Sequence, residues 1–339
     1  MRIAQVMAGA PAGGAELFYE RLTAALHRAG EEVLPVIRRD PARASRLRAE
    51  GVSPVELRFG GPLDLMTRTR LASALRQFAP KVTVAWMNRA ARFTPAGDWV
   101  LVGRQGGFYD VGYYRLCDHL VGNTRGIVDW IVSQGWPARR AHYLPNFVPD
   151  MGDTPPAALD VPAGAPVLLA LGRLHRNKAF DVLIRALPAL PAVHAVIAGE
   201  GPERGALSDL ARREGVADRV HVLGWRGDTA ALLAACDVFI CPSRHEPLGN
   251  VVIEAWSARR PVIAAAAQGP VELITDGADG ILVAKEDPGA LAQAIQRVLA
   301  DRPLALALAE AGRVRYETAF AEAPVVACWR DFLGSVEKA

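Results

Sequence analysis

The chain has 339 residues, enough for two domains of about 150 residues, each with a buried core. Its composition, 51% hydrophobic and 22% charged, is that of a soluble globular protein. No apolar run approaches the ~20 residues of a transmembrane helix, and the first residues lack the apolar core of a secretion signal. Four cysteines without CxxC spacing fit a reducing compartment, so we predict a cytoplasmic protein.

The net charge of +3 conceals a difference between the two halves of the chain. Residues 1–150 carry 20 Lys and Arg against 13 Asp and Glu, a net charge of +7. Residues 151–339 carry 19 against 23, a net charge of −4. We therefore expect an anionic partner, such as a membrane surface or a phosphorylated ligand, to meet the N-terminal half first, and we expect no nucleic acid partner.

Short apolar segments alternate with segments of helical period through the first 150 residues. This alternation predicts a mostly parallel sheet with helices on both faces. The predicted strands are 2–7, 32–37, 54–57, 81–86, 99–102, 118–122 and 142–144, and the predicted helices are 15–29, a helix opened by Asp40 and Pro41, 64–78 and 123–134.

Residues 147–165 are rich in proline and lack a clear period, which indicates a linker between domains. The alternation restarts at residue 167, so we predict an α/β protein with two Rossmann-like domains, 1–150 and 166–321, whose parallel sheets face each other across a cleft. The predicted strands are 167–171, 194–197, 220–223, 238–241, 261–265 and 280–283, and the predicted helices are 179–190, 204–214, 229–234, 248–258, 271–275, 288–299, 303–319 and 322–336.

A glycine-rich turn, 9–14, joins the first strand to the first helix. Glycines there let backbone N–H groups approach a phosphate at a helix N-terminus. The turn lacks GxGxxG spacing, however, and a tight turn without a ligand explains it equally well. A dinucleotide-dependent oxidoreductase is therefore the weakest functional hypothesis.

The turn after strand 167–171 places Arg173, Arg176 and Lys178 at a helix start. Ligands of a parallel sheet bind at such a turn, and an arginine and a lysine can together neutralise a diphosphate. The alternative is a solvated run of charges. That alternative explains poorly why one of only four lysines in the chain stands here.

Two glutamates, Glu246 and Glu254, flank the start of helix 248–258. The segment from Pro247 to Asn250 forms its N-terminus, whose free N–H groups can bind phosphate oxygens. A carboxylate on an apolar helix face is costly unless it is hydrogen-bonded, which suits Glu254 to a ribose and Glu246 to sugar hydroxyls. The alternative is that both are surface carboxylates.

Other chemistries have no signal in the sequence. There is no DxD pair for a divalent ion, the seven histidines form no HxxxH or His/Cys cluster, and no GxSxG motif is present. We expect no metal site and no cofactor.

Five motifs follow one another between residues 167 and 300, and their order and spacing resemble the donor domain of the retaining family 4 glycosyltransferases. That family has the GT-B fold of two Rossmann-like domains. The first half is similar more weakly, through GGAE at 13–16 and LPN at 144–146. The five motifs are GRLHRNK at 172–178, AGEGPER at 198–204, RVHVLGW at 219–225, Glu-x7-Glu at 246–254 and AQGPVELITDGADGILV at 267–283.

The resemblance implies roles for individual residues. Arg173 and Lys178 would neutralise the donor diphosphate and Glu246 would contact the transferred sugar, which makes these three the catalytic candidates. The last helix, 322–339, would pack on the N-terminal domain. The further donor-binding candidates are Gly14 from the first domain, then Glu200, Gly201, Leu223, Trp225, Leu248, Gly249, Asn250 and Glu254.

The first half departs from the family pattern, because many members carry a histidine in the acceptor cleft and neither 87–89 nor 104–110 contains one. A packing role is the alternative for every acceptor candidate. Helix 64–78 combines leucines with arginines and could lie on an anionic membrane, although a sheet-covering helix explains it as well. The acceptor-binding candidates are Glu16, Asn88, Arg89, Arg104 and Tyr109.

The resemblance implies a retaining, metal-independent hexosyltransferase that uses a nucleotide-diphosphate sugar, with UDP favoured. Its acceptor would be a glycan or lipid-linked saccharide of lipopolysaccharide or another surface glycan. The protein would be cytoplasmic, with room for peripheral contact at the anionic inner membrane. The alternatives are a non-hydrolysing sugar-nucleotide epimerase and a non-catalytic nucleotide-sugar-binding protein.

Overall fold

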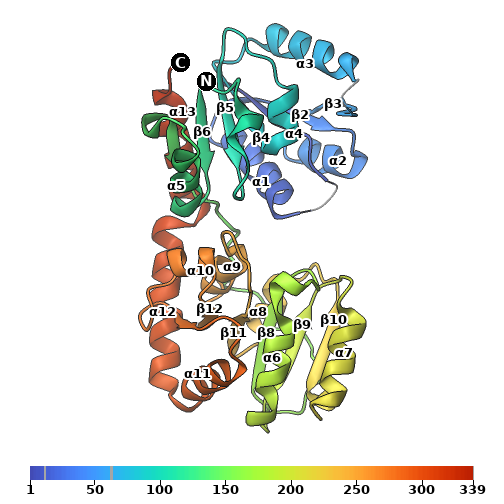
Figure 1. The fold of residues 1–339 in the computed structure, drawn as a ribbon, viewed down its shortest axis with the longest axis vertical. Coiled ribbons are helices and arrows are strands. Elements are labelled where there is room, and N and C mark those ends of the chain that lie inside the picture. The colour runs from blue at the N-terminus through green and yellow to red at the C-terminus, as the bar shows by residue number, and fades with distance from the viewer. Residues whose placement is uncertain (11–12, 62–63, 339) are drawn as a thin grey trace. The chain divides into compact units, whose positions relative to one another are not determined.

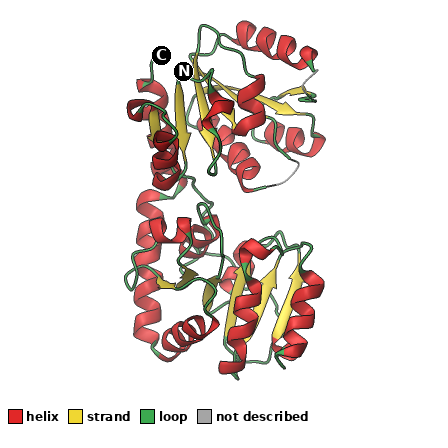
Figure 2. Cartoon of the chain, viewed as in Figure 1, coloured by secondary structure: helices red, strands yellow, loops and turns green. Residues whose placement is uncertain are grey.

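The computed structural model describes residues 1–10, 13–61 and 64–338. Pro11 and Ala12 of the glycine-rich turn, and Ala339 of the expected last helix, lie outside the described residues. The chain divides into two compact units, Met1–Phe147 with Glu322–Ala339, and Val148–Ala321 (Figure 1). In each unit helices cover a sheet of strands, and the observed α/β class is the one predicted (Figure 2).

The sheet of the N-terminal unit is fully parallel, with the order β3-β2-β1-β4-β5-β6-β7. The strand order reverses between β1 and β4, where doubly wound sheets bind their ligands. The strands are β1 (Arg2–Met7), β2 (Glu32–Arg38), β3 (Val55–Leu57), β4 (Val82–Trp86), β5 (Val100–Gln105), β6 (His119–Gly122) and β7 (Ala141–Tyr143). The helices between them are α1 (Gly14–Arg28), α2 (Pro41–Ala49), α3 (Leu65–Phe78), α4 (Met87–Phe93) and α5 (Arg125–Ser133).

Two details of this unit differ from the sequence prediction. A short helix, α4, directly follows β4, where no helix was predicted. It buries Ala90, Ala91 and Phe93, and its seven residues are too few to show a helical period. Strand β5 extends to Gln105, three residues beyond the predicted end, so that Arg104 belongs to a buried strand.

The last helix, α13 (Glu322–Ser335), belongs to the N-terminal unit and packs on α1. The Trp329 ring is fully buried and stacks on Trp86 of β4, with centroids 6.4 Å apart. Arg330 donates to the buried Glu31 carboxylate at 2.7 Å. Because Trp329 is buried against a central strand and Arg330 pairs with Glu31, α13 is an integral part of this unit.

The second unit has a fully parallel sheet in the order β10-β9-β8-β11-β12-β13, which reverses between β8 and β11. The strands are β8 (Val167–Leu171), β9 (His194–Ala198), β10 (Val220–Gly224), β11 (Val238–Cys241), β12 (Val262–Ala265) and β13 (Ile281–Val283). The helices are α6 (Phe180–Ala186), α7 (Arg204–Arg213), α8 (Thr229–Ala234), α9 (Asn250–Ser257), α10 (Gln268–Leu273), α11 (Pro288–Ala300) and α12 (Arg302–Ala319).

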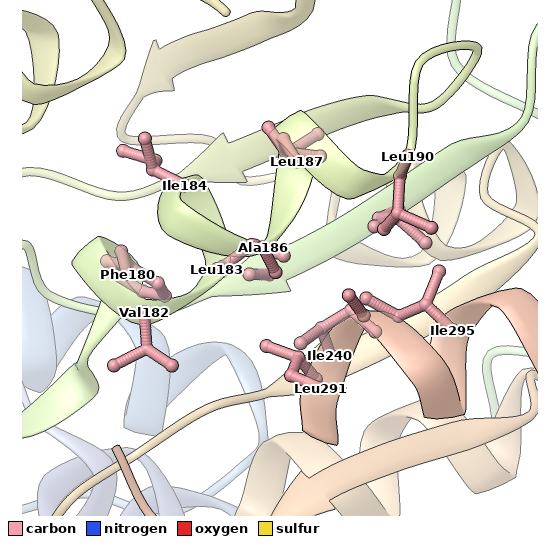
Figure 3. Packing of buried hydrophobic residues seen from close by; sticks show 14 of the residues in the cluster. Phe180, Val182, Leu183, Ile184, Ala186, Leu187, Leu190, Ile240, Leu291 and Ile295 are labelled. Atoms are coloured by element: carbon pink, nitrogen blue, oxygen red, sulfur yellow. The ribbon is translucent and has the colours of Figure 1, made fainter. Parts of the chain in front are cut away.

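Alternate residues of these strands enter two separate cores. Ile240 of β11 faces one core with α6, α7 and α11, and Phe239 faces the other with α9 and α12. Figure 3 shows the first core, where Leu183 of α6 lies near Ile240 and Leu291 of α11. Because both faces are covered, the edge formed by the carboxyl ends of the strands is left for a ligand.

The proline-rich segment expected to be a linker packs on the second unit from Val148 onward. Val148 and Met151 are buried in its core, and Ala157 N donates to the Ala231 carbonyl at 2.9 Å. Arg313 of α12 donates to both Asp150 carboxylate oxygens, at 2.6 and 2.7 Å. No helix in the described part of the chain is long and apolar enough to cross a bilayer.

Candidate active site

Two loops meet where the order of the second sheet reverses. One follows β8 and carries Lys178, and the other follows β11 and carries Glu246. The Asn177 carbonyl accepts hydrogen bonds from Arg244 N at 2.8 Å and from His245 N at 3.2 Å. These backbone bonds tie the loops together and set the distance between the side chains that they carry.

Lys178 and Glu246 form a direct ion pair, the Lys178 Nζ donating to the Glu246 carboxylate. Their side chains are 23% and 11% exposed, so the pair is largely desolvated. Ser243 Oγ donates to the same carboxylate oxygen at 3.2 Å. Burial disfavours the charged form of Lys178, but the Glu246 carboxylate outweighs it, and the pKa of Lys178 is raised. Lys178 is therefore a fully charged ammonium with a carboxylate already beside it.

Arg173 lies on the same loop as Lys178 but is exposed. It makes no hydrogen bond or ion pair with any residue that the structure describes. The nearby Arg244 differs, because its guanidinium binds both oxygens of Asp181 at 2.7 Å and Glu286 at 2.7 Å. Arg244 holds the loop in place, whereas Arg173 is available to an anion.

Glycines bring the surrounding loops into close contact. A Cβ on Gly199 would lie 1.9 Å from the Gly172 carbonyl oxygen, and one on Gly269 would lie 2.1 Å from that of Leu248. Gly249 caps α9 in the left-handed region, at φ 96°. Only a residue without Cβ fits the two close approaches, so these glycines shape the site.

Helix α9 starts at Asn250 and places Glu254 one turn later, half-buried. Leu248 is buried just before it, beneath the Gly269 loop. The start of a helix carries the positive end of the helix dipole, which favours an anion. The structure thus brings the predicted Leu248, Gly249, Asn250 and Glu254 to the loop that carries Glu246.

The candidates for the nucleotide lie on the loops after β9 and β10. Gly201 packs against the Leu174 backbone, and Arg204 links the Glu200 carboxylate, at 3.3 Å, to the Val222 carbonyl, at 3.2 Å. Trp225, which follows β10, is 78% exposed. Burying so large an apolar ring is favourable, so its exposure marks a surface that a flat ligand can cover.

The N-terminal unit has a cavity of about 320 Å³ at the carboxyl ends of β1 and β4. It brings together Glu16, Asn88, Arg89 and Tyr109 of the acceptor candidates. Arg38 and Met87, which the sequence reasoning missed, line it too; Met87 is held in the left-handed region at φ 63°. Strained backbone of this kind is often found at functional sites. Trp86, Ala8, Gly9 and Ala10 complete the lining.

The carboxylate of Glu16 folds back into the glycine-rich turn. It accepts a hydrogen bond from Ala10 N at 2.9 Å, and a Cβ on Gly9 or Gly13 would lie within 2.4 Å of its oxygens. The described part of the turn therefore holds a negative side chain where the sequence allowed a phosphate. Gly14 itself is the first residue of α1.

Arg104 does not line this cavity. It is 1% exposed, donates to Asn146 Oδ1 at 2.6 Å, and lies over the rings of Trp86 and Phe18 at 4.7 and 5.4 Å. Burial lowers the pKa of Arg104 to about 10. The strand that carries it continues past the predicted end, which turns the side chain into the interior.

Some residues of the site in the second unit could not be selected from the sequence. The Asn177 carbonyl acts through a contact with a distant loop, and Ser243 acts through a hydrogen bond to Glu246 on its own loop. Small polar residues are common in any turn, so neither stands out from the sequence. Within the described ranges, no group of three His, Cys, Asp or Glu side chains could hold a metal ion.

Comparison with known proteins identifies the family. Residues 165–301 match the family described as glycosyl transferases group 1. LpsE of Rhizobium meliloti, a lipopolysaccharide core biosynthesis glycosyltransferase, is 34% identical over 95% of this chain and 96% of its own. LpsD, of the same organism and description, is 34% identical over 94% of both chains.

Solved structures agree on the fold. HepE of Anabaena, crystallised with UDP, superposes with a TM-score of 0.85 at 21% identity, covering 99% of this chain and 100% of that one. The same protein crystallised with UDP-glucose gives a TM-score of 0.84. The resemblance and the fold predicted from the five motifs are confirmed, and the chain belongs to the group 1 glycosyltransferases of family 4, with the GT-B fold.

Proposed function

We propose that the protein transfers a sugar from a UDP-sugar to a saccharide of the lipopolysaccharide core. The observation that carries the proposal is the Lys178–Glu246 pair beside the unpaired Arg173, at the edge where a doubly wound sheet binds its ligand. The likeness to LpsE and LpsD over almost the whole chain supports the acceptor class. The likeness to HepE, which binds UDP and UDP-glucose, supports the donor.

In this proposal two cations stabilise the departing diphosphate. Arg173 binds it from the exposed side of the loop, and Lys178 turns from Glu246 toward it. The N–H groups at the start of α9 bind further phosphate oxygens. Fixed charges aimed at developing negative charge are commonly the largest catalytic contribution, so no divalent ion is required.

Glu246 and Glu254 then bind hydroxyl groups. Released from Lys178, the Glu246 carboxylate accepts hydrogen bonds from the transferred sugar, with Ser243 keeping its orientation. Glu254 accepts from the ribose, and the exposed Trp225 covers the base together with Glu200, Gly201 and Leu223. Each carboxylate thus serves as an acceptor for a substrate hydroxyl.

We propose transfer with retention of the anomeric configuration. The bond from the anomeric carbon to the diphosphate oxygen breaks, and a bond to the acceptor oxygen forms on the same face. The acceptor's proton passes to the diphosphate oxygen that leaves. NMR analysis of the product anomer tests this step, and inversion would exclude it.

The cavity of the N-terminal unit is the proposed acceptor site, with Asn88, Arg89 and Tyr109 in contact with the acceptor. Glu16, whose carboxylate lines the same cavity, can bind an acceptor hydroxyl. We place the reaction in the cytoplasm, in keeping with the four free cysteines.

The test is transfer of radiolabelled glucose from UDP-glucose to lipopolysaccharide of a Rhizobium meliloti strain that lacks LpsE. Arg173→Ala should lower kcat/KM by about 10²–10³ if it contributes as one oxyanion-hole donor does. Arg213→Ala removes an exposed arginine at the far end of α7 and should be neutral. Near-normal turnover by a folded Arg173→Ala protein refutes the assignment. A sugar nucleotide altered without acceptor would favour the epimerase.

A further inference from the structure

Five exposed arginines of the N-terminal unit line neighbouring cavities, and each of the five has no carboxylate within ion-pair distance among residues 1–10, 13–61 and 64–338. Some arginines elsewhere in the unit are paired, such as Arg28 with Glu50 and Glu322. Others, such as Arg70 and Arg76 of α3, have no ion pair with any described residue but line none of these cavities. What distinguishes this set is its place along neighbouring cavities, and not the absence of ion pairs alone. We call it the arginine face: Arg38, Arg68, Arg89, Arg92 and Arg115.

All five line three adjoining cavities of about 320, 420 and 460 Å³. The first, already described, shares Asn88 and Arg89 with the second. The second shares Arg68, Arg92 and Tyr113 with the third, which ends at Arg115. Each volume lies in the range of roughly 300–1,000 Å³ that small-ligand sites occupy. The cavities form a continuous path from the acceptor site across the unit.

The arginine face brings like charges close together. Arg89 and Arg92 are three residues apart on α4, where like charges repel. The Arg68 guanidinium donates to the Arg92 carbonyl at 3.2 Å, which adds a third cation to the same place. Asp110, the acidic residue of the third cavity, accepts from Gly112 N at 2.8 Å. Concentrated positive charge of this kind is stabilised when an anion binds.

Aromatic rings alternate with these cations. Tyr113 is 40% exposed and lines both the second and the third cavity, with the Arg92 guanidinium 5.8 Å from its ring centre. Phe93 forms part of the second cavity. Rings offer the apolar faces of sugars a stacking surface, and guanidinium groups bind carboxylate or phosphate. The combination matches an acidic saccharide better than either group would alone.

We propose that the arginine face is an extended subsite for an acidic acceptor, binding several sugar residues that carry carboxylate or phosphate groups. The inference rests on the proposed function, since it extends the same acceptor site. Concave cavities with an aromatic ring favour a saccharide over a lipid surface. Leu65 and Met66, 71% and 57% exposed at the start of α3, are the competing feature, and anionic lipid is an outcome of the test.

The test compares two double variants. Arg92→Gln with Arg115→Gln removes two charges from the arginine face, and Arg70→Gln with Arg76→Gln removes two exposed charges of α3 that line none of the three cavities. The probe is tetragalacturonate, with its methyl ester as the neutral counterpart, measured by isothermal titration calorimetry at two salt concentrations.

We expect the wild-type protein and the α3 variant to bind tetragalacturonate more weakly as salt rises, and not to bind the methyl ester. The Arg92/Arg115 variant should bind it about tenfold more weakly, with an unchanged melting temperature. Equal binding by all three proteins, or no binding by the wild type, overturns the proposal. A third result also overturns it: the wild type binds phosphatidylglycerol–phosphatidylcholine vesicles but not tetragalacturonate, and the Arg92/Arg115 variant no longer binds the vesicles.

Titration with UDP in the same preparations separates the two proposals. The Arg92/Arg115 variant should bind UDP as the wild type does, because both residues belong to the N-terminal unit and all donor candidates except Gly14 belong to the second. If the wild type binds UDP and transfers glucose but all three proteins bind tetragalacturonate equally, the arginine-face proposal is refuted and the proposed function stands. If UDP is not bound, the proposed function fails.

Discussion

Separate replacement of Lys178 and Glu246 should have opposite effects on the affinity for UDP. In the structure each neutralises the other, so a diphosphate must compete with Glu246 for the Lys178 ammonium. Lys178→Met removes the cation that the diphosphate needs. Glu246→Gln removes the competing charge, keeps the shape of the side chain and leaves an oxygen that can accept from Ser243.

The magnitudes follow from burial. Removing one partner of a buried pair costs about 3–5 kcal/mol. Because 23% of the Lys178 side chain remains exposed, we expect Lys178→Met to cost about 2–3 kcal/mol. At roughly 2–4 °C per kcal/mol for a unit of this size, its melting temperature should fall by about 4–12 °C. Losing a charge-assisted bond to UDP costs a further ~1.5–3 kcal/mol of binding, a roughly 10–150-fold weaker Kd.

Glu246→Gln should bind UDP about fivefold more tightly, the equivalent of ~1 kcal/mol, because the ammonium is released. Its turnover with UDP-glucose should nevertheless fall, since the carboxylate no longer binds the sugar. Titration calorimetry with UDP and a turnover assay on both variants measure these effects. If Glu246→Gln binds UDP as weakly as Lys178→Met does, the ion pair does not compete with the donor and the reasoning is refuted.

Three other predictions concern backbone fit, pH and metal. Gly199→Ala should lower the melting temperature and weaken UDP binding, because its Cβ would meet the Gly172 carbonyl at 1.9 Å, whereas Gly205→Ala in open space should be neutral; equal effects would contradict this. Burial and the neighbouring His119 lower the pKa of His142 from 6.5 to about 4, so the unfolded chain binds the proton first and stability should fall as pH drops from 6.5 to about 4. His142→Gln should flatten that slope in thermal unfolding. Activity should persist in excess EDTA, and loss that Mg²⁺ restores would show that a metal is required.

Most of the second unit could be predicted from the sequence because its information is local. Each strand is a short apolar run, and each ligand-binding turn follows its strand directly, as 172–178 follows β8. A motif of contiguous residues can be recognised in the sequence without knowledge of the fold. In the N-terminal unit, four of the five acceptor candidates line one cavity, and their role stays a prediction.

Tertiary contacts could not be predicted in the same way. Lys178 and Glu246 are 68 residues apart, and nothing in either motif says that they neutralise each other. Arginine is a residue type that often binds ligands, but Arg104 belongs to β5, which extends beyond its apolar residues. Helix α4 has only seven residues, too few to show a helical period in the sequence. The arginine face forms only when α3 and α4 fold beside each other.

The return of α13 to the N-terminal unit has a consequence for synthesis on the ribosome. The first 147 residues leave the exit tunnel long before residues 322–335, while the second unit, 148–321, emerges in one uninterrupted stretch. Until Trp329 arrives, the ring of Trp86 lacks the partner that stacks on it. The N-terminal unit is therefore translated first but completed last, because it lacks α13 until the end of the chain has been synthesised.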